Sequence, residues 1–282
     1  MKILVTGARG MMGTDMCDVL AQGHDVAGVD IEDFDILNGE AVLEAIEALA
    51  PEIVVHLAGF TRVEDAEDQK DEAFNTNAVG TMNMAKASRD AGARLIYVST
   101  DYVFDGSKDS PYVETDIPAP INFYGLTKLF GERYASSLNP RHLIVRTSWL
   151  YGPNGKNFVD TILARAREGA PLRVVDDQRG SPTYTCHLAR GIRAALEKGV
   201  EGTLHMANSG ETTWYEFART ALELAGLEAE IKPVSSSEYV TKAARPKNSV
   251  LGSLVIGHAG LEPLPDWKHG LREHLARREA AQ

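Results

Sequence analysis

The chain opens with Lys2-Ile3-Leu4-Val5-Thr6-Gly7-Ala8-Arg9-Gly10-Met11-Met12-Gly13, and this stretch decides the fold. It begins with a short apolar run, continues with three closely spaced glycines, and leads into a helical pattern that reaches Leu20. Glycine is needed where the backbone takes unusual dihedral angles, where it approaches a phosphate, and where a helix packs closely on a strand. The free N–H groups at the start of the helix can bind phosphate oxygens. The stretch therefore predicts a strand, a turn and a helix that bind a dinucleotide.

Apolar runs and helical patterns alternate through the rest of the first half. The apolar runs are Val26–Val29, Ile53–Leu57, Leu95–Val98 and Leu143–Val145, and the helical patterns are Met11–Leu20, Ala41–Leu49 and Phe74–Ala91. This alternation is typical of βαβ units, and short strands that are apolar on both faces indicate a parallel sheet covered by helices. We expect an α/β protein with a Rossmann-type doubly wound parallel sheet, which binds ligands at the carboxyl ends of its strands.

Beyond about residue 150, proline and glycine separate shorter elements. Helical patterns cover Phe158–Arg167, His187–Leu196, Trp214–Leu224 and Trp267–Ala276, and weaker strand candidates lie at Arg173–Val175 and Leu204–Met206. We expect residues 1–150 to form a nucleotide-binding domain. Residues 151–282 should form mainly a smaller α/β substrate-binding lobe, with some segments returning to the first domain.

Composition excludes several classes of partner. The chain has 40 acidic and 29 basic residues, a formal charge of -11, so a basic face that binds nucleic acid is not expected. Cys17 and Cys186 are too few for a disulfide framework and indicate a reducing compartment. The start of the chain leaves no room for a signal peptide, and no apolar stretch approaches the roughly 18 residues of a membrane span. We expect a cytoplasmic protein without a membrane partner.

Asp30 ends the second apolar run, at about the distance from the glycine turn where an acid binds the adenosine ribose. A carboxylate there repels a 2'-phosphate and favours NADH. Arg9, inside the turn, could attract a 2'-phosphate and favour NADPH. The two residues conflict, so the preference between the two nucleotides stays open.

Tyr124-Gly-Leu-Thr-Lys128 begins a helical pattern that runs to about Ser137, so the tyrosine and lysine share one face. A phenol with a pKa near 10 is a poor acid-base catalyst unless its surroundings adjust it, and a nearby ammonium could do so. On its own such a pair is more often an incidental surface pair. Here it follows a nucleotide-binding turn, and Ser99-Thr100 ends a strand upstream whose hydroxyl groups could hold a carbonyl oxygen. The chain is therefore predicted to be an NAD(P)-dependent oxidoreductase.

Five motifs, in order along nearly the whole chain, make the prediction of an oxidoreductase more specific. They are His56-Leu-Ala-Gly-Phe-Thr-Arg-Val-Glu-Asp-Ala-Glu67, Ser99-Thr-Asp-Tyr-Val-Phe-Asp-Gly106, Tyr124-Gly-Leu-Thr-Lys-Leu-Phe-Gly-Glu132, Val174-Val-Asp-Asp-Gln-Arg-Gly-Ser-Pro-Thr183 and Arg245-Pro-Lys-Asn-Ser-Val-Leu251. Together with the glycine turn they resemble the dTDP-4-dehydrorhamnose reductase family of the extended short-chain dehydrogenase/reductase superfamily.

The resemblance implies reduction of the C4 ketone of dTDP-4-dehydro-L-rhamnose, a step in dTDP-rhamnose and cell-surface polysaccharide biosynthesis. NADPH or NADH would supply the hydride and Tyr124 the proton. Lys128 would lower the tyrosine pKa and hold the nicotinamide ribose, and Thr100 would tune the tyrosine. Together with Tyr124 and Lys128, the implied cofactor-contacting residues are Gly7, Gly10, Met11, Met12, Gly13, Asp30, Asp35, Ile36, Ala58, Gly59, Phe60 and Thr61.

The resemblance also implies a substrate site. Its residues are Val63, Thr100, Asp101, Trp149, Gln178 and Arg245. Trp149 would cover the substrate, while Gln178 and Arg245 would line the nucleotide-diphosphate end, where an arginine suits a pyrophosphate. The alternatives are that Trp149 packs between the lobes and that Arg245 is a surface charge.

Several interpretations of the function, the oligomeric state and the metal dependence stay open. The same fold serves reductases and epimerases of other nucleotide-linked deoxysugars, and a non-catalytic regulatory subunit that resembles the methionine adenosyltransferase beta subunit. Some family members form a Mg2+-linked dimer, and Asp15 lies near one acid expected for it, although a solvated helix acid explains Asp15 equally well. Monomer and homodimer both stay possible. The eight histidines lack zinc-binding spacing, so no protein-bound catalytic metal is expected.

Overall fold

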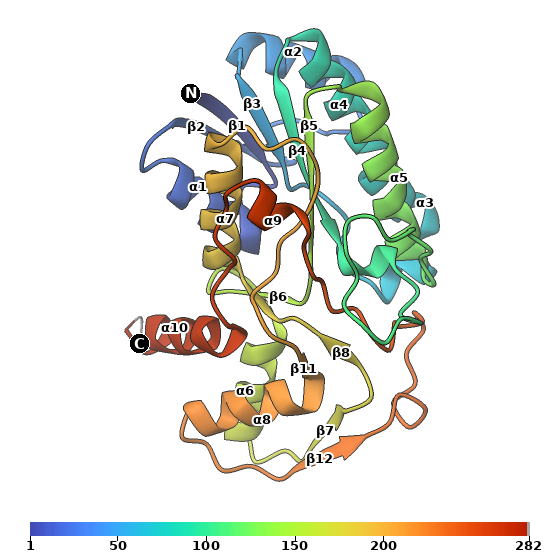
Figure 1. The fold of residues 1–282 in the computed structure, drawn as a ribbon, viewed down its shortest axis with the longest axis vertical. Helices are drawn as coiled ribbons and strands as arrows, with labels where there is room; N and C mark the ends of the chain where they lie inside the picture. The colour runs from blue at the N-terminus through green and yellow to red at the C-terminus, as the bar shows by residue number, and fades with distance from the viewer. Residues whose placement is uncertain (281–282) are drawn as a thin grey trace.

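A six-stranded parallel sheet occupies one half of the molecule (Figure 1), and the computed structural model describes residues 1–280. The strand order is β10-β5-β4-β3-β1-β2. The bounds are β1 Lys2–Thr6, β2 Asp25–Val29, β3 Ile53–His56, β4 Arg94–Thr100, β5 His142–Thr147 and β10 Gly202–His205. The predicted Rossmann-type sheet is confirmed. Because the chain passes from β1 outward to β2 and then back to β3 on the other side, the ends of β1 and β3 form the switch point where such sheets bind ligands.

Helices cover both faces of this sheet (Figure 1). On one face α1 (Met11–Leu20) packs against α7 (Thr185–Glu197), and on the other α4 (Thr81–Asp90) packs between α2 (Gly39–Leu49) and α5 (Phe123–Leu138). The inner strands β1, β3, β4 and β5 are therefore buried on both faces, which is why they appear in the sequence as continuous apolar runs.

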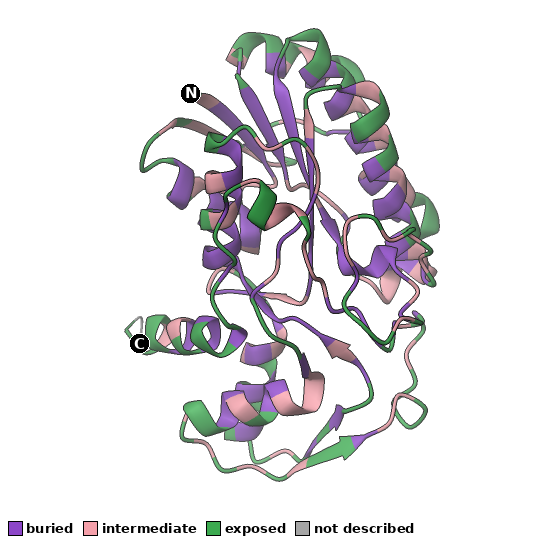
Figure 2. Cartoon of the chain, viewed as in Figure 1, coloured by how far each residue is buried: buried purple, intermediate pink, exposed green. Residues whose placement is uncertain are grey.

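Alternate residues of β1 enter opposite apolar layers, because successive side chains of a strand point to opposite faces. Ile3 and Val5 join the layer under α1 and α7, and Leu4 joins the layer under α2 and α4. Figure 2 shows that burial extends along the strands, whereas the outer sides of the helices are exposed. The core thus fixes the register that brings the strand ends to one edge.

The second half supplies two elements to this main sheet. β10 pairs with β5, and α7 lies on α1, where Leu188 and Ile192 are fully buried in the first apolar layer. The Leu204–Met206 and His187–Leu196 patterns therefore belong to the sheet unit rather than to the smaller lobe. A boundary near residue 150 stays a prediction, since the chain crosses it more than once.

The smaller half combines short strand pairs with three helices (Figure 1). The pairs are β6 (Leu150–Tyr151) with β9 (Thr183–Tyr184), β7 (Leu172–Val175) with β12 (Ile231–Val234), and β8 (Arg179–Gly180) with β11 (Thr212–Thr213). The helices are α6 (Phe158–Arg167), α8 (Trp214–Leu224) and α10 (Trp267–Glu279), and a short α9 (Val255–His258) lies near β10. An aromatic core containing Tyr151, Phe217 and Trp267 holds them together.

The predicted helix Phe74–Ala91 is longer and less regular than expected. It begins as α3 (Lys70–Phe74), widens into a π-helical turn over Asn75–Gly80, and continues as α4. Single-turn 3-10 segments lie at Asp65–Glu67 and Asp101–Val103. A π-helical turn is rare and often marks a functional position.

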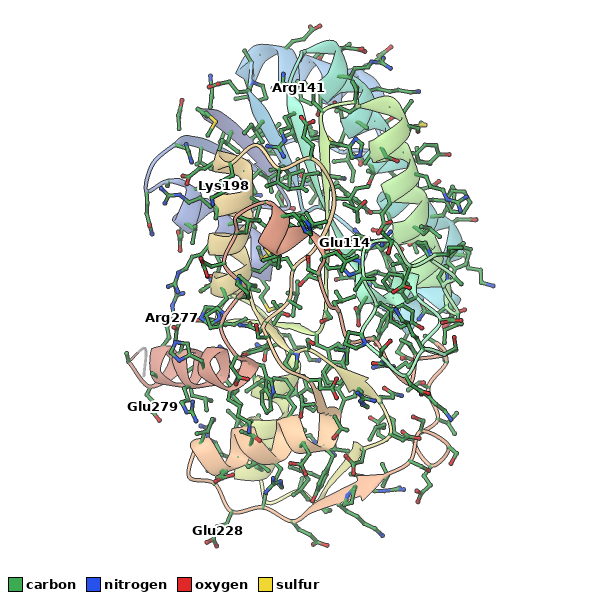
Figure 3. The ribbon with its side chains drawn as sticks, in the orientation of Figure 1. Glu114, Arg141, Lys198, Glu228, Arg277 and Glu279 are labelled. Carbon is green, nitrogen blue, oxygen red and sulfur yellow. The ribbon has the colours of Figure 1, made fainter. Side chains whose placement is uncertain are left out.

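Charged side chains lie mainly on the outside of the molecule. Figure 3 places Arg141, Lys198, Glu228 and Glu279 on its surface. Within residues 1–280, we find no helix with the length and apolar character needed to cross a membrane.

Candidate active site

A cleft of about 950 Å³ lies at the carboxyl ends of the sheet strands and reaches the smaller half. Residues that were not predicted as site residues also line it, among them Thr147, Ser148 and Trp214. Thr147 ends β5 and Ser148 follows it, so their position at a strand end was a usable signal in the sequence. Most of the predicted residues line the cleft, namely Gly7, Gly10, Met11, Met12, Gly13, Asp30, Asp35, Ile36, Ala58, Gly59, Thr61, Val63, Thr100, Asp101, Tyr124, Trp149 and Arg245.

The glycine turn fits a dinucleotide by its lack of side chains. Gly7 has a φ of +67°, and a Cβ there would lie 2.7 Å from the backbone nitrogen of Ala58. A Cβ on Gly13 would collide with the carbonyl of Gly7. The N-cap of α1 is Gly10, whose missing side chain leaves the first N–H groups of the helix without a cap. These groups are therefore available to a pyrophosphate.

The adenosine end of the cleft is acidic. The Asp30 carboxylate accepts hydrogen bonds from the backbone N–H groups of Arg9 and Ile31, each at 2.9 Å. The Arg9 guanidinium pairs with Glu32 and, at 3.3 Å, with Asp33. The cation that could attract a 2'-phosphate is therefore already occupied by two carboxylates.

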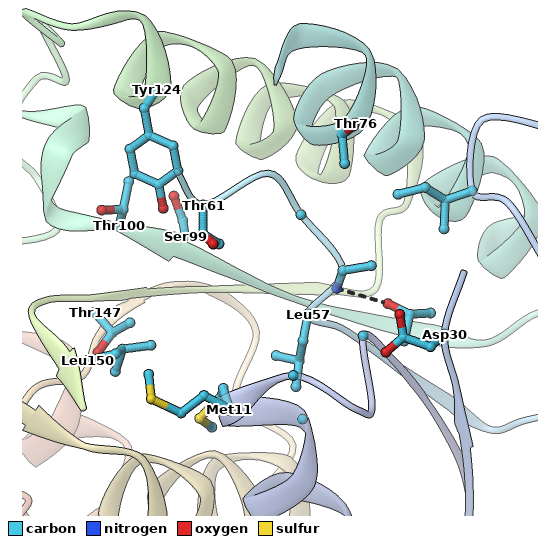
Figure 4. A pocket seen from close by; sticks show the side chains of 18 of the residues that line it. Met11, Asp30, Leu57, Thr61, Thr76, Ser99, Thr100, Tyr124, Thr147 and Leu150 are labelled. Atoms are coloured by element: carbon cyan, nitrogen blue, oxygen red, sulfur yellow. Dashed lines mark hydrogen bonds between the residues drawn. The ribbon is translucent and has the colours of Figure 1, made fainter. Parts of the chain in front are cut away.

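Tyr124 points from α5 toward the strand end that carries Ser99 and Thr100 (Figure 4). Burial raises the pKa of the Tyr124 phenol above its ordinary value, the charge of Asp101 raises it further, and the hydroxyl group of Thr100 lowers it. A phenol in these surroundings keeps its proton at neutral pH. It can therefore act as an acid toward a group that gains negative charge.

Thr100 and Asp101 form the opposite wall. The Thr100 hydroxyl donates to Asp101 Oδ1 at 3.0 Å and accepts from the backbone N–H of Tyr102 at 3.2 Å. Asp101 is 2% exposed, and its Oδ2 has no hydrogen-bond partner among the described residues. Burial raises the pKa of Asp101 to about 7, partly offset by the hydroxyl groups of Ser249 and Thr100.

Lys128 lies behind the cleft rather than on its surface. Its Nζ donates to the carbonyl of Val98 at 2.8 Å, and a Cβ on Gly59 would lie 3.9 Å from that nitrogen. Burial lowers the pKa of Lys128 to about 7, and the charge of Glu132 raises it. Burial has the largest influence on the Tyr124 pKa and raises it. The expectation that Lys128 lowers the tyrosine pKa stays a prediction.

The loop after β3 is clamped by Asn77, which sequence reasoning missed. Its Oδ1 accepts from the N–H of Phe60 at 2.8 Å, and its Nδ2 donates to the carbonyl of Phe60 at 3.0 Å and to Thr127 at 2.9 Å. The π-helical turn carries this buried side chain. Phe60 is buried and does not line the cleft, so a cofactor contact of this residue stays a prediction.

Trp149 lies where β5 leaves the main sheet. Its φ of +48° falls in the left-handed region that side chains rarely adopt. The indole packs against Gly180, where any Cβ would collide with it, and stacks on Trp214. Trp149 thus lines the cleft and also packs against the smaller half, and its role as a cover over the substrate stays a prediction.

Of the two residues predicted for the diphosphate end, only Arg245 lines the cleft. Its Nη2 donates to Glu64 at 2.7 Å. Gln178 is buried outside the cleft, where its amide donates to Ser236 at 2.9 Å. A substrate role for Gln178 stays a prediction.

Asp15 is not a solvated helix acid. It is 1% exposed and accepts hydrogen bonds from Asn154, at 2.9 Å, and from Thr185, with Arg277 at 3.5 Å. These partners tie α1 to the second half of the chain. The local network explains the residue without a metal ion.

His187, His269 and Glu273 are the one group of potential metal ligands within the described chain. The side-chain oxygen of Asn208 accepts a hydrogen bond from the backbone N–H of Tyr184. The amide nitrogen of Asn208 therefore faces His187 Nδ1, at 2.8 Å, and donates a hydrogen bond to it. The hydrogen of the neutral imidazole is then on Nε2. Glu273 lies 3.2 Å from His187 Nε2 and 3.0 Å from His269 Nε2, and His187 Nε2 makes no hydrogen bond among the described residues. With its hydrogen on Nε2, neutral His187 has no lone pair there for a metal.

The chain is similar over nearly its whole length to known proteins of one family. A model described as the RmlD substrate binding domain matches residues 1–280. The chain is 40% identical to the spore coat polysaccharide biosynthesis protein SpsK of Bacillus subtilis, over 99% of both proteins, and 39% identical to a dTDP-4-dehydrorhamnose reductase of Mycolicibacterium smegmatis, over 98% of this chain and 85% of that protein. A crystal structure of dTDP-4-dehydrorhamnose reductase from Bacillus anthracis in complex with NADP superposes with a TM-score of 0.96, at 38% identity, over 98% of this chain and 99% of that one.

Proposed function

The chain belongs to the RmlD substrate-binding domain family, and we propose that it reduces the C4 ketone of dTDP-4-dehydro-L-rhamnose to dTDP-L-rhamnose. It is an NAD(P)-dependent oxidoreductase of dTDP-rhamnose biosynthesis, and NADPH or NADH is its hydride donor. The observation that carries the proposal is Tyr124, a buried phenol that keeps its proton and points into the cleft beside Thr100.

The reaction converts a ketone to an alcohol by adding a hydride to the carbon and a proton to the oxygen. The reduced nicotinamide supplies the hydride when it is bound. Tyr124 Oη supplies the proton as negative charge develops on the ketone oxygen, and the tyrosinate left behind is reprotonated from solvent. The glycine turn and the start of α1 would hold the pyrophosphate of the nucleotide, at the same cleft that Tyr124 lines.

Trp149 and Arg245 complete the substrate side in this proposal. Trp149 covers the sugar, and Arg245 binds the diphosphate, for which its planar guanidinium has the right geometry. Glu64 holds Arg245 at the cleft before substrate arrives. Asp101, which is buried and lines the cleft, would face the sugar from the Thr100 wall.

A reductase of another nucleotide-linked deoxysugar would need only a changed pocket. The joint presence of Tyr124 and Thr100 in one cleft supports catalysis over a regulatory subunit. A nucleotide-sugar substrate is consistent with the family, and a cytoplasmic location and a monomeric or homodimeric state stay predictions.

The variant Tyr124→Phe tests the assigned proton donor. It removes one hydroxyl and keeps the ring, so we expect turnover to fall at least a hundredfold while NADPH still binds with the wild-type Kd, because general acid catalysis contributes on the order of 10²–10⁴-fold. Turnover and Kd are measured on the same preparation. Wild-type turnover by this variant would remove Tyr124 from the mechanism.

A further inference from the structure

The ammonium group of Lys128 lies in a nearly closed environment. The residue is 7% exposed, and among the described residues its Nζ has one hydrogen bond, to the carbonyl of Val98. Burying a cation without compensating contacts is unfavourable, which is why buried lysines tend to lose their proton. Something besides one carbonyl has to stabilise the charged form if Lys128 is to hold a nucleotide ribose.

The face of the Tyr97 ring supplies such a contact. Lys128 Nζ lies 4.2 Å from the centroid of the ring, well within the range of a cation–π interaction. Tyr97 is fully buried and comes from β4, the strand that ends at Thr100. Gly131 on α5 makes the ring position possible, because a Cβ there would collide with the phenol oxygen.

The other charged and titratable groups around Lys128 stabilise its ammonium group less than their number suggests. Glu132 raises the lysine pKa, but it is paired with Arg146 through two hydrogen bonds of 2.9 and 2.7 Å, and it also accepts from Ser99. On β3, His56 is neutral, since burial and the charge of Lys128 lower its pKa to about 3.

The remaining neighbour on α5 adds no charge. Tyr124, one turn before Lys128, stays protonated because burial raises its pKa. Besides the Val98 carbonyl, the ring of Tyr97 is therefore the direct contact within residues 1–280 that favours the ammonium over the amine.

We propose that Tyr97 is a positioning residue of the active site, whose ring face keeps Lys128 charged and holds its ammonium behind Gly59 at the wall of the cleft. Its catalytic meaning rests on the proposed function. The contact itself is a property of the folded protein and can be measured without turnover. Failure of the reductase assay and failure of this inference are therefore separate results.

The test compares Tyr97→Phe with Tyr97→Leu. Phenylalanine keeps the ring face, whereas leucine removes it and leaves a pH-independent packing defect. The unfolding free energy of each variant is measured by urea titration from pH 5.5 to pH 8.5. The cation–π contact exists only while Lys128 is charged in the folded state, so the advantage of phenylalanine over leucine should be greatest below pH 7 and shrink as the pH rises above it.

Activity gives a second readout. Loss of the ring face lowers the pKa of Lys128. The limb of the pH profile of kcat that reports Lys128 should therefore move down by about one pH unit in Tyr97→Leu and stay in place in Tyr97→Phe. A merely structural role would lower kcat equally at every pH. If the difference in unfolding free energy between the two variants is constant from pH 5.5 to 8.5, the inference is wrong.

A fluorinated phenylalanine series at position 97 covers the case in which the leucine variant does not fold. Successive fluorines weaken the negative ring face and change its shape little. Under the inference, the unfolding free energy at pH 6 declines steadily along the series, while at pH 8.5 it stays level. A level response at both pH values contradicts it.

Discussion

The indole rings of Trp149 and Trp214 lie stacked, with centroids 3.6 Å apart and planes within 6° of parallel. Trp149 follows the end of β5, and Trp214 is the first residue of α8 in the smaller half. Both line the cleft. The stack therefore joins the catalytic edge of the sheet to the lobe that completes the substrate site.

Replacing Trp214 with alanine should loosen Trp149 and weaken binding of the nucleotide sugar. Aromatic pairs contribute about 0.5–1.5 kcal/mol beyond their buried area, so we expect KM for the sugar nucleotide to rise up to about tenfold while kcat changes little. Trp214→Phe keeps an aromatic partner and is the matched control. Steady-state kinetics measure the effect, and an unchanged KM in the alanine variant would show that the stack does not support the substrate site.

The acidic adenosine end predicts a preference for NADH. Arg9 is occupied by Glu32 and Asp33, and Asp30 adds a further negative charge, so a 2'-phosphate meets net repulsion. Freeing Arg9 with Glu32→Gln and Asp33→Asn together should raise kcat/KM for NADPH relative to NADH severalfold, a modest change because these groups are exposed and screened.

The measurement is the ratio of the two kcat/KM values at low and at physiological ionic strength. Arg9→Ala in the double-variant background is the control, and it should return the ratio toward the wild-type value. A wild-type enzyme that already prefers NADPH would contradict this account of Arg9.

Asp101 should make stability depend on pH. Burial raises its folded-state pKa from near 4 to about 7, so the folded protein binds the proton more tightly than the unfolded chain does. Its contribution to stability is complete below about pH 4 and is lost as the pH rises toward 7, by about 4 kcal/mol at most. Asp101→Asn should flatten this part of the profile, measured by urea unfolding between pH 4.5 and 8. An identical slope in wild type and variant would show that the carboxyl group ionises normally.

The fold could be predicted from sequence because its signals are local. Helix Met11–Leu20 and the apolar runs of the main strands lie where the pattern indicates, since each depends only on periodicity and on the glycine turn. The π-helical turn at Asn75–Gly80 was not predictable in this way, because its side chains continue a helical pattern. The return of β10 to the sheet depends on its pairing with β5, which lies far away in the sequence, and such pairing is a tertiary property.

The site residues that belong to short sequence motifs could be predicted. Tyr124 and Thr100 meet in the cleft because both belong to short motifs at strand and helix ends. Trp214 lies 65 residues from Trp149, and nothing in its local sequence indicates that it stacks there. The surroundings of Lys128 were missed for the same reason, since burial by Tyr97 arises only when β4 and α5 pack together.

The most direct test of the central claim is oxidation of the reduced nicotinamide by the purified protein with dTDP-4-dehydro-L-rhamnose, run separately with NADH and NADPH. The account predicts that one nicotinamide is oxidised for each C4 ketone reduced, with dTDP-L-rhamnose as the product. No net oxidation of either nucleotide, with the substrate intact or merely epimerised, would contradict it.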